Sequence, residues 1–300
     1  MKLLLLGRNG QLGWELQRSL AVLGEVVALD RGGEPLCGDF TRPDAVAETV
    51  RRVQPDAIVN AAAYTAVDKA ESEPDLARAI NATAVAALAR EAAGLGAWLV
   101  HFSTDYVFDG SGDAPRDEAA PTGPLNVYGR SKLEGEVAIR ASGCKHLILR
   151  ASWVHGARGG NFAKTMLKLA AERERLQVID DQIGAPTGAE LLADITAHAL
   201  RAAHRSSELA GTYHAAAAGE TSWHGYARFV IKWARANGKA IKVMPDAIEA
   251  VPTGAFPTAA RRPRNSRLDT HRLRTTFGLH LPAWEVGVQR MLDELRPHAP

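Results

Sequence analysis

Short apolar runs alternate with helical patterns through the first half of this 300-residue chain, and this alternation constrains the fold more than any other feature. The apolar runs predict strands at residues 2–6, 25–29, 57–60, 98–102 and 146–149. Helices are expected between them, at residues 10–23, 44–53, 74–93 and in a segment around Tyr128. Strands that are apolar on both faces and alternate with helices are typical of a parallel sheet covered by helices on each side. The predicted fold class is therefore α/β, a doubly wound parallel sheet of the Rossmann type.

Three glycines punctuate the first strand-to-helix turn, in the sequence Gly7-Arg8-Asn9-Gly10-Gln11-Leu12-Gly13. Glycine lets the backbone turn sharply and approach a pyrophosphate, whose charge is favoured at a helix N-terminus. The spacing G-x-x-G-x-x-G differs from the G-x-G-x-x-G fingerprint, and glycine-rich turns of this kind also occur without a nucleotide. The predicted cofactor contacts in this turn are Gly7, Gly10, Gln11, Leu12 and Gly13.

The ends of the following segments support a dinucleotide site. Asp30 ends the second strand close to the ~20-residue offset at which a carboxylate binds the adenosine ribose, although a solvated turn would also suit it. Arg31 can neutralise a 2′-phosphate, so NADPH and NADH both stay open. A later carboxylate can accept from the adenine amine, and small side chains close the third strand where backbone passes under a cofactor. These further predicted contacts are Asp39, Phe40, Ala61, Ala62, Ala63, Tyr64 and Thr65.

The regular alternation weakens after Ala151. Helices are expected at residues 161–173, 189–202, 223–236 and 284–295, strands at 176–179 and 211–215, and an ordered loop or lid at 251–265. We expect a cofactor-binding Rossmann domain at residues 1–150, to which segments around 187–215 return. Residues 151–300 are expected to form mainly a smaller, irregular α/β substrate domain at the carboxyl edge of the sheet, where ligands bind in such folds.

Composition excludes several classes of function. The net charge of +2 provides no electrostatic footprint for nucleic acid. Cys37 and Cys144 have no pairing pattern, which favours a reducing compartment. The apolar opening at residues 1–6 stops at Gly7, too soon for a signal peptide or a membrane span. We therefore expect a cytoplasmic protein that does not associate with membranes.

Tyr128 and Lys132 are four residues apart on a predicted helix, and this spacing places both side chains on one face. An ammonium beside a phenol lowers the pKa of that phenol from its usual value near 10 and makes it a usable proton donor. With a dinucleotide site, the pair indicates hydride transfer to or from a carbonyl. Alone, the same pair would be an ordinary aromatic contact and a solvated lysine, and the glycine turn argues against that interpretation.

Six stretches of the chain, together with the glycine turn, resemble the extended short-chain dehydrogenase/reductase superfamily and, within it, the dTDP-4-dehydrorhamnose reductases. The resemblance covers nearly the whole chain and implies reduction of dTDP-4-dehydro-β-L-rhamnose to dTDP-β-L-rhamnose by NADPH or NADH. The stretches are NAAAYTAVDKAESE (60–73), STDYVF (103–108), PLNVYGRSK (124–132), NFAKTM (161–166), DQIGAPTGAEL (181–191) and ARRPRNSRL (260–268).

The resemblance also implies roles for individual residues. Tyr128 would donate a proton to the developing alkoxide, Lys132 would hold the nicotinamide ribose, and Thr104 would bond the same substrate oxygen. Related dehydratases carry an Asp-Glu pair after the threonine, whereas this chain has Asp105-Tyr106 and therefore lacks the base for elimination. Asp105 is expected to bond a sugar hydroxyl, or else to cap a turn.

Candidate substrate contacts lie in the second half of the chain. Trp153 can pack on a sugar face or be buried at a domain junction. Guanidinium groups in the run that contains Arg262 suit a diphosphate, although a solvated loop is an equal alternative. Asn161 and Gln182 are the other candidates. The predicted substrate contacts are thus Thr104, Asp105, Tyr128, Trp153, Asn161, Gln182 and Arg262.

The histidine spacing predicts no catalytic metal, and Mg²⁺ enters only because some relatives are associated with it at a subunit contact. A homodimer is possible, because a C-terminal helix with Trp284, Val288 and Met291 at helical spacing can serve as core or interface. Two alternative functions stay open. One is another NDP-sugar 4-reductase or epimerase; the other is a non-catalytic NADP-binding regulatory subunit resembling that of methionine adenosyltransferase. The intact Tyr128–Lys132 pair weighs against the second.

Overall fold

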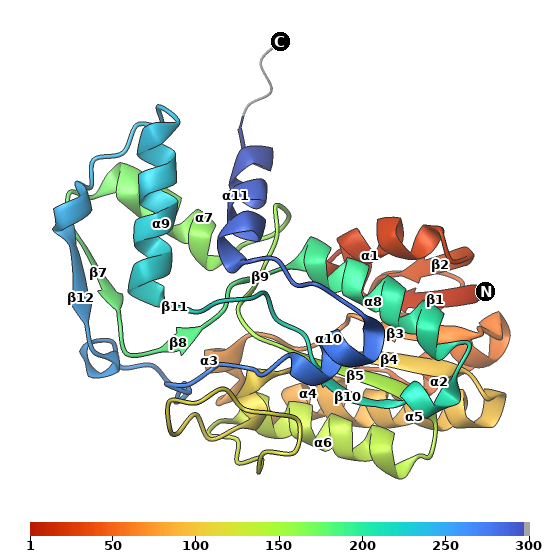
Figure 1. Cartoon of the computed structure of the whole chain (residues 1–300). Helices are drawn as coiled ribbons and strands as arrows, with labels where there is room; N and C mark the ends of the chain where they lie inside the picture. The colour runs from red at the N-terminus through yellow and green to blue at the C-terminus, as the bar shows by residue number, and fades with distance from the viewer. Residues whose placement is uncertain (297–300) are drawn as a thin grey trace.

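A six-stranded parallel sheet forms the centre of the computed structural model, which describes residues 1–296 (Figure 1). Its strands lie in the order β10-β5-β4-β3-β1-β2. Their bounds are β1 Lys2–Leu6, β2 Glu25–Leu29, β3 Ala57–Asn60, β4 Trp98–Thr104, β5 Lys145–Ala151 and β10 Gly211–His214. The chain passes from β1 outward to β2 and then returns to β3 on the other side of β1. The strand order therefore reverses at β1, the place where open α/β sheets bind ligands beyond their carboxyl ends.

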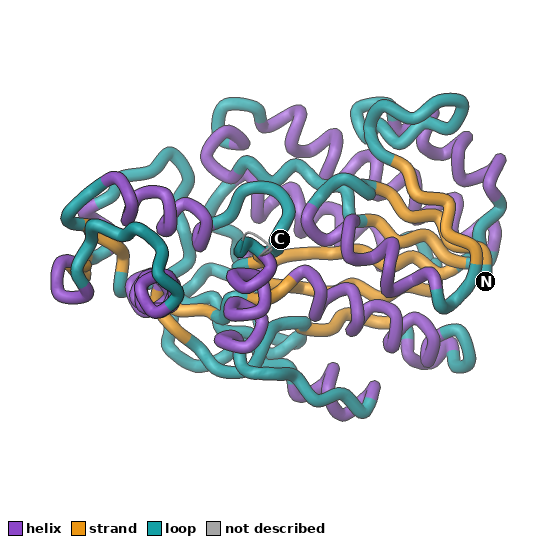
Figure 2. The backbone as a smooth tube through the Cα atoms, turned by 90° about the horizontal axis from the view of Figure 1, so that it is seen from above, coloured by secondary structure: helices purple, strands orange, loops and turns teal. Residues whose placement is uncertain are grey.

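Helices cover both faces of this sheet (Figure 2). One face packs against α1 (Gln11–Ala21), α8 (Ala189–Ala203) and α10 (His271–Phe277), and the other against α2 (Pro43–Val53), α5 (Ala84–Leu95) and α6 (Val127–Ala141). Alternate residues of each strand enter the two cores: Leu3 and Leu5 face the first, Leu4 and Leu6 the second. This burial on both faces explains the uninterrupted apolar runs, and it confirms the predicted doubly wound α/β fold.

The helix expected at residues 74–93 is divided. It consists of α4 (Pro74–Arg78), a π-helical turn η1 (Ala79–Thr83) and α5. Asn81 lies in the π-helical turn and is 1% exposed. Its Oδ1 accepts a hydrogen bond from the Tyr64 backbone N–H at 2.9 Å, and its Nδ2 donates to Oγ of Ser131 at 3.0 Å. The wider turn thus joins the segment after β3 to α6. The short helix α3 (Val67–Ala70) and the helix α10 were not expected from the sequence.

The remaining elements build a smaller layer beside the carboxyl edge of the sheet (Figure 1). Its helices are α7 (Phe162–Glu172), α9 (Trp223–Ala236) and α11 (Trp284–Glu294). Its strands form three pairs: β7 (Leu176–Ile179) with β12 (Ile248–Val251), β8 (Ile183–Gly184) with β11 (Thr221–Ser222), and β6 (Val154–His155) with β9 (Thr187–Gly188). The short helices η2 (Asp105–Val107), η3 (Ser207–Leu209), η4 (Pro245–Ala247) and η5 (Thr253–Ala255) lie in connections.

The second layer has its own apolar core, and α11 contributes to it. Trp284, Val288 and Met291 are 6%, 0% and 2% exposed and pack with α7 and α9 side chains, so within this chain they are core residues. By contrast, α8 packs on the large sheet, and β10 is its edge strand beside β5. A division of the chain at residue 150 stays a prediction.

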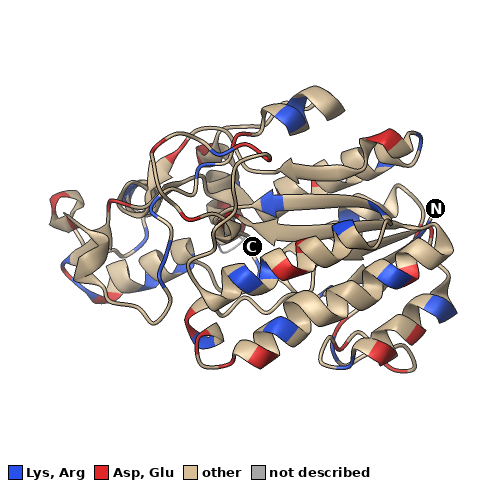
Figure 3. Cartoon of the chain, turned by 90° about the horizontal axis from the view of Figure 1, so that it is seen from below, with Lys and Arg blue, Asp and Glu red and all other residues tan. Residues whose placement is uncertain are grey.

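Charged residues of both signs are interspersed over the helices (Figure 3). None of the helices formed by residues 1–296 combines the length and the apolar character needed to cross a bilayer.

Candidate active site

The turn between β1 and α1 requires glycine at two positions. Gly7 has φ +90°, and a Cβ there would stand 2.7 Å from the backbone nitrogen of Ala62. A Cβ on Gly13 would overlap the carbonyl oxygen of Gly7. The first turn of α1 can therefore lie directly against the strand, with its N-terminus open for an anionic group.

A cavity of about 600 Å³ adjoins this turn. It brings together eight of the predicted cofactor contacts from three strand ends: Gly7, Gly10, Asp30, Asp39, Phe40, Ala61, Ala62 and Ala63. Arg31, the candidate for a 2′-phosphate, lines the same cavity. Its walls combine two carboxylates with small and aromatic apolar surface, a composition that fits the adenosine end of a dinucleotide.

The charged side chains at the rim of the cavity already make some hydrogen bonds and ion pairs within the protein. Asp30 accepts from the Gly32 backbone N–H at 3.0 Å and from the side chain of Asn9. Arg31, whose side chain is 79% exposed, reaches Asp39 at 3.4 Å. An exposed guanidinium with one long ion pair can turn toward another anion at little cost.

The remaining predicted cofactor contacts lie outside this cavity. Gln11 and Leu12 occupy the first turn of α1, where Nε2 of Gln11 donates to the carbonyl of Gly160 at 3.4 Å. The Tyr64 hydroxyl donates to Glu73 at 2.7 Å, and Thr65 is exposed. The Tyr64 phenol is therefore committed to another side chain.

Thr104, Asp105 and Tyr128 meet at the carboxyl end of β4. Thr104 is the last residue of that strand, and Oδ1 of Asn126 caps α6 by accepting from the Gly129 N–H at 2.8 Å, which begins the helix just before Tyr128. Thr104 Oγ1 donates to Asp105 at 3.1 Å, and the Thr104 and Tyr128 hydroxyls are also hydrogen-bonded. A carbonyl oxygen of a substrate placed here would meet two hydroxyl groups.

The pKa of Tyr128 differs from the expectation. Burial raises it to about 12, the hydrogen bond with Thr104 opposes that rise, and the charge of Asp105 adds to it. Lys132 does not hydrogen-bond to the Tyr128 phenol as expected. Its Nζ lies 3.1 Å from Nε2 of His101 instead. Burial lowers the pKa of Lys132 to about 8, while Glu136 opposes that change. The helix face does carry both residues, but the lysine points deeper, toward the sheet.

Asp105 is a buried carboxyl with spare hydrogen-bonding capacity. It is 2% exposed, and its Oδ2 has no hydrogen-bond partner within residues 1–296. Burial raises its pKa to about 6, although hydrogen bonds from Ser266 and Thr104 oppose that rise. A buried acceptor of this kind is costly unless a ligand completes it, which favours the expected contact with a sugar hydroxyl over a turn cap.

Trp153 and Gln182, two predicted substrate contacts, both contact Trp223, which was not predicted from the sequence. The Trp153 and Trp223 rings stack with centroids 3.6 Å apart and 12° between their planes. Trp223 Nε1 donates to Oε1 of Gln182 at 3.1 Å. Nothing in the sequence around Trp223 beyond its aromatic character could have indicated this role, because the stack joins a loop residue between β5 and β6 to the first residue of α9, far apart in the chain.

Asn161 and Arg262 are occupied by the protein itself. Asn161 caps α7, accepting from the Lys164 N–H at 3.1 Å and donating to the Gly156 carbonyl at 2.8 Å. Arg262 donates to both carboxylate oxygens of Asp68, at 3.1 and 2.7 Å. Asn161 is therefore positioned as a structural cap, whereas Arg262 keeps further N–H groups for a ligand.

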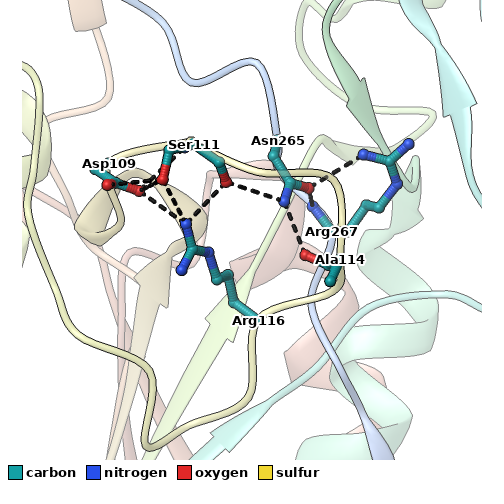
Figure 4. Close-up of polar contacts among 6 residues, drawn as sticks. All are labelled: Asp109, Ser111, Ala114, Arg116, Asn265 and Arg267. Atoms are coloured by element: carbon teal, nitrogen blue, oxygen red, sulfur yellow. Dashed lines mark hydrogen bonds and ion pairs between the residues drawn. The ribbon is translucent and has the colours of Figure 1, made fainter.

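The segment 251–265 is an ordered strap across the carboxyl edge. Asn126 Nδ2 donates to the Arg261 carbonyl at 2.7 Å. Figure 4 shows how its end is anchored: Asn265 donates to the carbonyl of Ala114 at 2.8 Å, while Arg116 holds Asp109 at 3.0 Å in the same loop. The strap thus brings Arg262 to the site from the far end of the chain.

Within the part of the chain that the structure describes, no three His, Cys, Asp or Glu side chains are arranged as ligands of a metal ion.

Comparison with known proteins adds the following findings. The family model of the RmlD substrate binding domain matches residues 1–297. The chain is 58% identical over 295 residues to the dTDP-4-dehydrorhamnose reductase of Shigella flexneri, with 98% of each chain covered. It is 48% identical over 299 residues to that of Burkholderia thailandensis, covering 98% of this chain and 99% of the relative.

Solved structures agree with these sequences. A dTDP-4-dehydrorhamnose reductase from Bacillus anthracis in complex with NADP is 37% identical, with a TM-score of 0.87 and coverage of 98% and 99%. The UDP-glucose 4-epimerase of Thermus thermophilus, in complex with NAD, is 20% identical, with a TM-score of 0.78 over 100% of both chains, and shares the fold.

Proposed function

Because the chain belongs to the family of the RmlD substrate binding domain, we propose that it reduces dTDP-4-dehydro-β-L-rhamnose to dTDP-β-L-rhamnose with NADPH or NADH. It is an oxidoreductase of the extended short-chain dehydrogenase/reductase type. The observation that carries the proposal is the meeting of the Thr104 and Tyr128 hydroxyls at the same carboxyl edge of the sheet as the glycine turn, in a chain whose 58%-identical relative is named for this reaction.

A nicotinamide dinucleotide fits the residues present. Gly7 and Gly13 let the first turn of α1 lie against the strand ends, with its N-terminus open for a pyrophosphate. Asp30 offers a carboxylate for the ribose, and Asp39 and Phe40 line the cavity. When bound, the reduced cofactor supplies the hydride that the C4 carbonyl of the sugar accepts.

Side chains of the protein then stabilise the negative charge that develops on the carbonyl oxygen of the sugar. Tyr128 donates its proton to the oxygen of the reduced carbonyl, and Thr104 donates a hydrogen bond to the same atom. A phenol with a pKa raised by burial is still a far stronger acid than an alcohol, so this transfer runs downhill. Asp105 accepts from a neighbouring sugar hydroxyl with its free Oδ2, which orients the ring.

Tyr106 explains why reduction rather than elimination is proposed. It stands where related dehydratases carry a glutamate, and its ring meets that of Tyr128 edge-on, with centroids 5.6 Å apart. Burial, followed by the charge of Asp105, raises the pKa of the Tyr106 phenol above its usual value, so the phenol stays protonated and cannot accept a proton. No carboxylate therefore occupies the position needed to remove a ring proton.

We further propose contacts for the nucleotide and a cellular setting. Asp68 uses two N–H groups of Arg262, and the guanidinium has others for a diphosphate. The Trp153–Trp223 stack and Gln182 offer an apolar face with a polar edge for the sugar nucleotide. Both cysteines, Cys37 and Cys144, are free, in keeping with work in a reducing cytoplasm in dTDP-L-rhamnose biosynthesis.

The test is an assay of the purified chain with dTDP-4-dehydro-β-L-rhamnose and each reduced cofactor. We expect loss of absorbance of the reduced nicotinamide and formation of dTDP-β-L-rhamnose by NMR. No consumption with either cofactor would remove the assignment, and a new 4-epimer without net oxidation of cofactor would favour an epimerase.

A further inference from the structure

A polar chain crosses the otherwise apolar layer between the sheet and α6. Asn60 on β3 and His101 on β4 are partners in register, so their side chains lie on the same face. Nδ2 of Asn60 lies 3.0 Å from Nδ1 of His101, and Nε2 of His101 lies 3.1 Å from Nζ of Lys132. The three side chains are 1%, 0% and 2% exposed. Water therefore cannot supply alternative partners.

The direction of donation is fixed at the Asn60 end of these hydrogen bonds. The backbone N–H of Ala62 donates to Oδ1 of Asn60 at 3.0 Å, and a backbone N–H can only donate. The amide oxygen of Asn60 must face Ala62, and its NH₂ group must face His101. Nδ1 of the imidazole must then accept.

The direction continues to Lys132. A neutral imidazole that accepts at Nδ1 carries its proton on Nε2. That N–H points at Nζ, which must offer a lone pair, and only the uncharged amine has one. A charged ammonium would force the imidazole proton onto Nδ1, opposite the amide NH₂ of Asn60. To relieve that contact the amide would have to rotate and give up the N–H of Ala62.

Few negative charges near Lys132 are available to stabilise its ammonium form. On α6 itself, Glu136 lies one turn further, but its carboxylate is bound by Arg150 of β5 at 2.8 and 2.7 Å and by Arg140 at 3.0 Å. The residue facing it from β3 is the uncharged Asn60, and from β4 it is His101. Burial, followed by the charge of Lys132, holds the pKa of His101 well below its usual value, so this imidazole is neutral.

We propose that Asn60 and His101 form a directional hydrogen-bond chain that places Lys132 and disfavours its charged form, which makes His101 a positioning residue for the reaction proposed above. The chain starts at Ala62, which lines the cofactor cavity, and ends on the lysine one helical turn from Tyr128. The lysine charge is thereby coupled to a hydrogen bond at the wall of that cavity. The inference rests on the proposed function only for its consequence in catalysis.

The matched variant is Asn60→Asp, which keeps the side-chain shape and reverses the direction. One carboxylate oxygen keeps the Ala62 N–H, and the other accepts from Nδ1–H of His101. Nε2 then becomes an acceptor, and the ammonium of Lys132 fits.

The first measurement needs no activity. Long-range ¹H–¹⁵N NMR of the wild-type protein at about pH 9.5, above the Lys132 pKa of about 8, should show a neutral His101 imidazole with its proton on Nε2, and Asn60→Asp should move that proton to Nδ1. At that pH, a wild-type imidazole protonated on Nδ1, or on both nitrogens, would overturn the proposal, even if Asn60→Asp failed to fold.

The second measurement is the pH dependence of kcat/KM for reduction. The wild-type rate should fall above pH ~8 as Lys132 loses its proton, and Asn60→Asp should move that limb upward by at least one pH unit. His101→Gln, whose amide is free to turn its oxygen toward the lysine, should move it in the same direction. His214→Gln replaces an equally buried histidine on β10 that takes no part in the Asn60–His101–Lys132 hydrogen bonds, and it should leave the limb of the pH profile in place.

The outcomes separate the two proposals. An unmoved limb in both Asn60→Asp and His101→Gln contradicts the role of the hydrogen-bond chain while leaving the reductase assignment intact. If the wild-type protein has the Nε2–H tautomer of His101 but no reductase activity, the hydrogen-bond chain is supported and the proposed function is removed.

Discussion

Arg262 donates two hydrogen bonds to the carboxylate of Asp68, at 3.1 and 2.7 Å, and this contact joins residues 194 positions apart. It holds the strap of residues 251–265 against the short helix α3, next to Tyr106. The same carboxylate accepts from the Ala260 backbone N–H at 3.1 Å, and the hydrogen bond from Arg262 is the main cause that lowers the pKa of Asp68. The guanidinium therefore has a fixed orientation before any ligand arrives.

Replacing Arg262 should affect binding more than chemistry. Arg262→Ala removes a pre-oriented guanidinium that faces the proposed diphosphate position, so we expect KM for the sugar nucleotide to rise by roughly tenfold to a hundredfold, equivalent to ~1.5–3 kcal/mol. The cofactor KM should change little. Steady-state kinetics check this, with Arg78→Ala, which breaks an exposed ion pair with Glu134, as the control. An unchanged substrate KM would place the diphosphate elsewhere.

Replacing Tyr128 should slow turnover strongly without affecting cofactor binding. Tyr128→Phe keeps the ring that meets Tyr106 edge-on and removes only the hydroxyl that bonds Thr104. Loss of a positioned proton donor typically costs ~10²–10⁴ in rate, and we expect kcat to fall within that range. Quenching of tryptophan fluorescence by NADPH should give an unchanged dissociation constant. A fully active variant would show that another group donates the proton.

Much of this site follows from sequence, and the reasons are local. The apolar runs that form β1, β3 and β4 identify buried parallel strands, and their ends locate Gly7, Ala61–Ala63 and Thr104 because carboxyl ends of parallel strands share one edge. Tyr128 is identified by its four-residue spacing from Lys132 on a predicted helix, which in the structure starts at the Asn126 cap. These features depend on neighbouring residues only.

Other features depend on pairing between strands or on side-chain direction. His101 interrupts the apolar pattern of β4, and this one signal was available, but its partners Asn60 and Lys132 meet it only through strand register and the crossing of α6. The π-helical turn at Asn81 inserts a residue into an alanine-rich helix whose sequence shows no break. The spacing of Tyr128 and Lys132 identified their common face, but not that the lysine turns toward the sheet.

The tryptophan stack should be required for substrate binding and for the stability of the second layer. Trp223→Ala removes the ring that stacks on Trp153 and the donor to Gln182, and we expect a loss of roughly 2–4 kcal/mol in the free energy of unfolding together with a higher substrate KM. Trp223→Phe keeps an aromatic face and should recover most of the stability, but not the hydrogen bond. Urea denaturation and substrate titration measure the two effects separately. Equal stability of Trp223→Ala and wild type would contradict the packing argument.

Cofactor preference should respond to Arg31. This side chain is 79% exposed and lies at the cavity that also holds Asp30, so it is the nearest candidate for a 2′-phosphate. Arg31→Ala should lower kcat/KM for NADPH by about tenfold relative to NADH, since one charge-assisted hydrogen bond contributes roughly 1.5 kcal/mol. Paired assays with the two cofactors measure the ratio. A ratio that does not move would mean that Arg31 does not contact the phosphate.

Asp105 should make stability depend on pH in a direction opposite to that of most acidic residues. Burial is the largest cause that raises the pKa of this carboxyl, to about 6, above the value near 3.8 expected for an unfolded chain. The folded state therefore holds its proton more tightly, and stability is lost as pH rises from ~4 to ~6 and stays lost above that range. A shift of about two units corresponds to ~3 kcal/mol. Asp105→Asn removes the ionisation, so the variant should unfold at higher urea than wild type at pH 7 and at similar urea at pH 4.

The same substitution should lower catalytic efficiency, because an amide has one accepting oxygen, whereas the carboxylate accepts from Thr104 with Oδ1 and keeps Oδ2 for a sugar hydroxyl. A gain in stability with a loss of activity is the pattern expected where a buried acceptor is kept for a ligand rather than for the fold. Urea midpoints at both pH values and kcat/KM at pH 7 test the two halves independently. Equal midpoints at pH 7 would mean that the carboxyl is solvated or compensated in the folded enzyme, and the argument that a sugar hydroxyl completes it would fail with them.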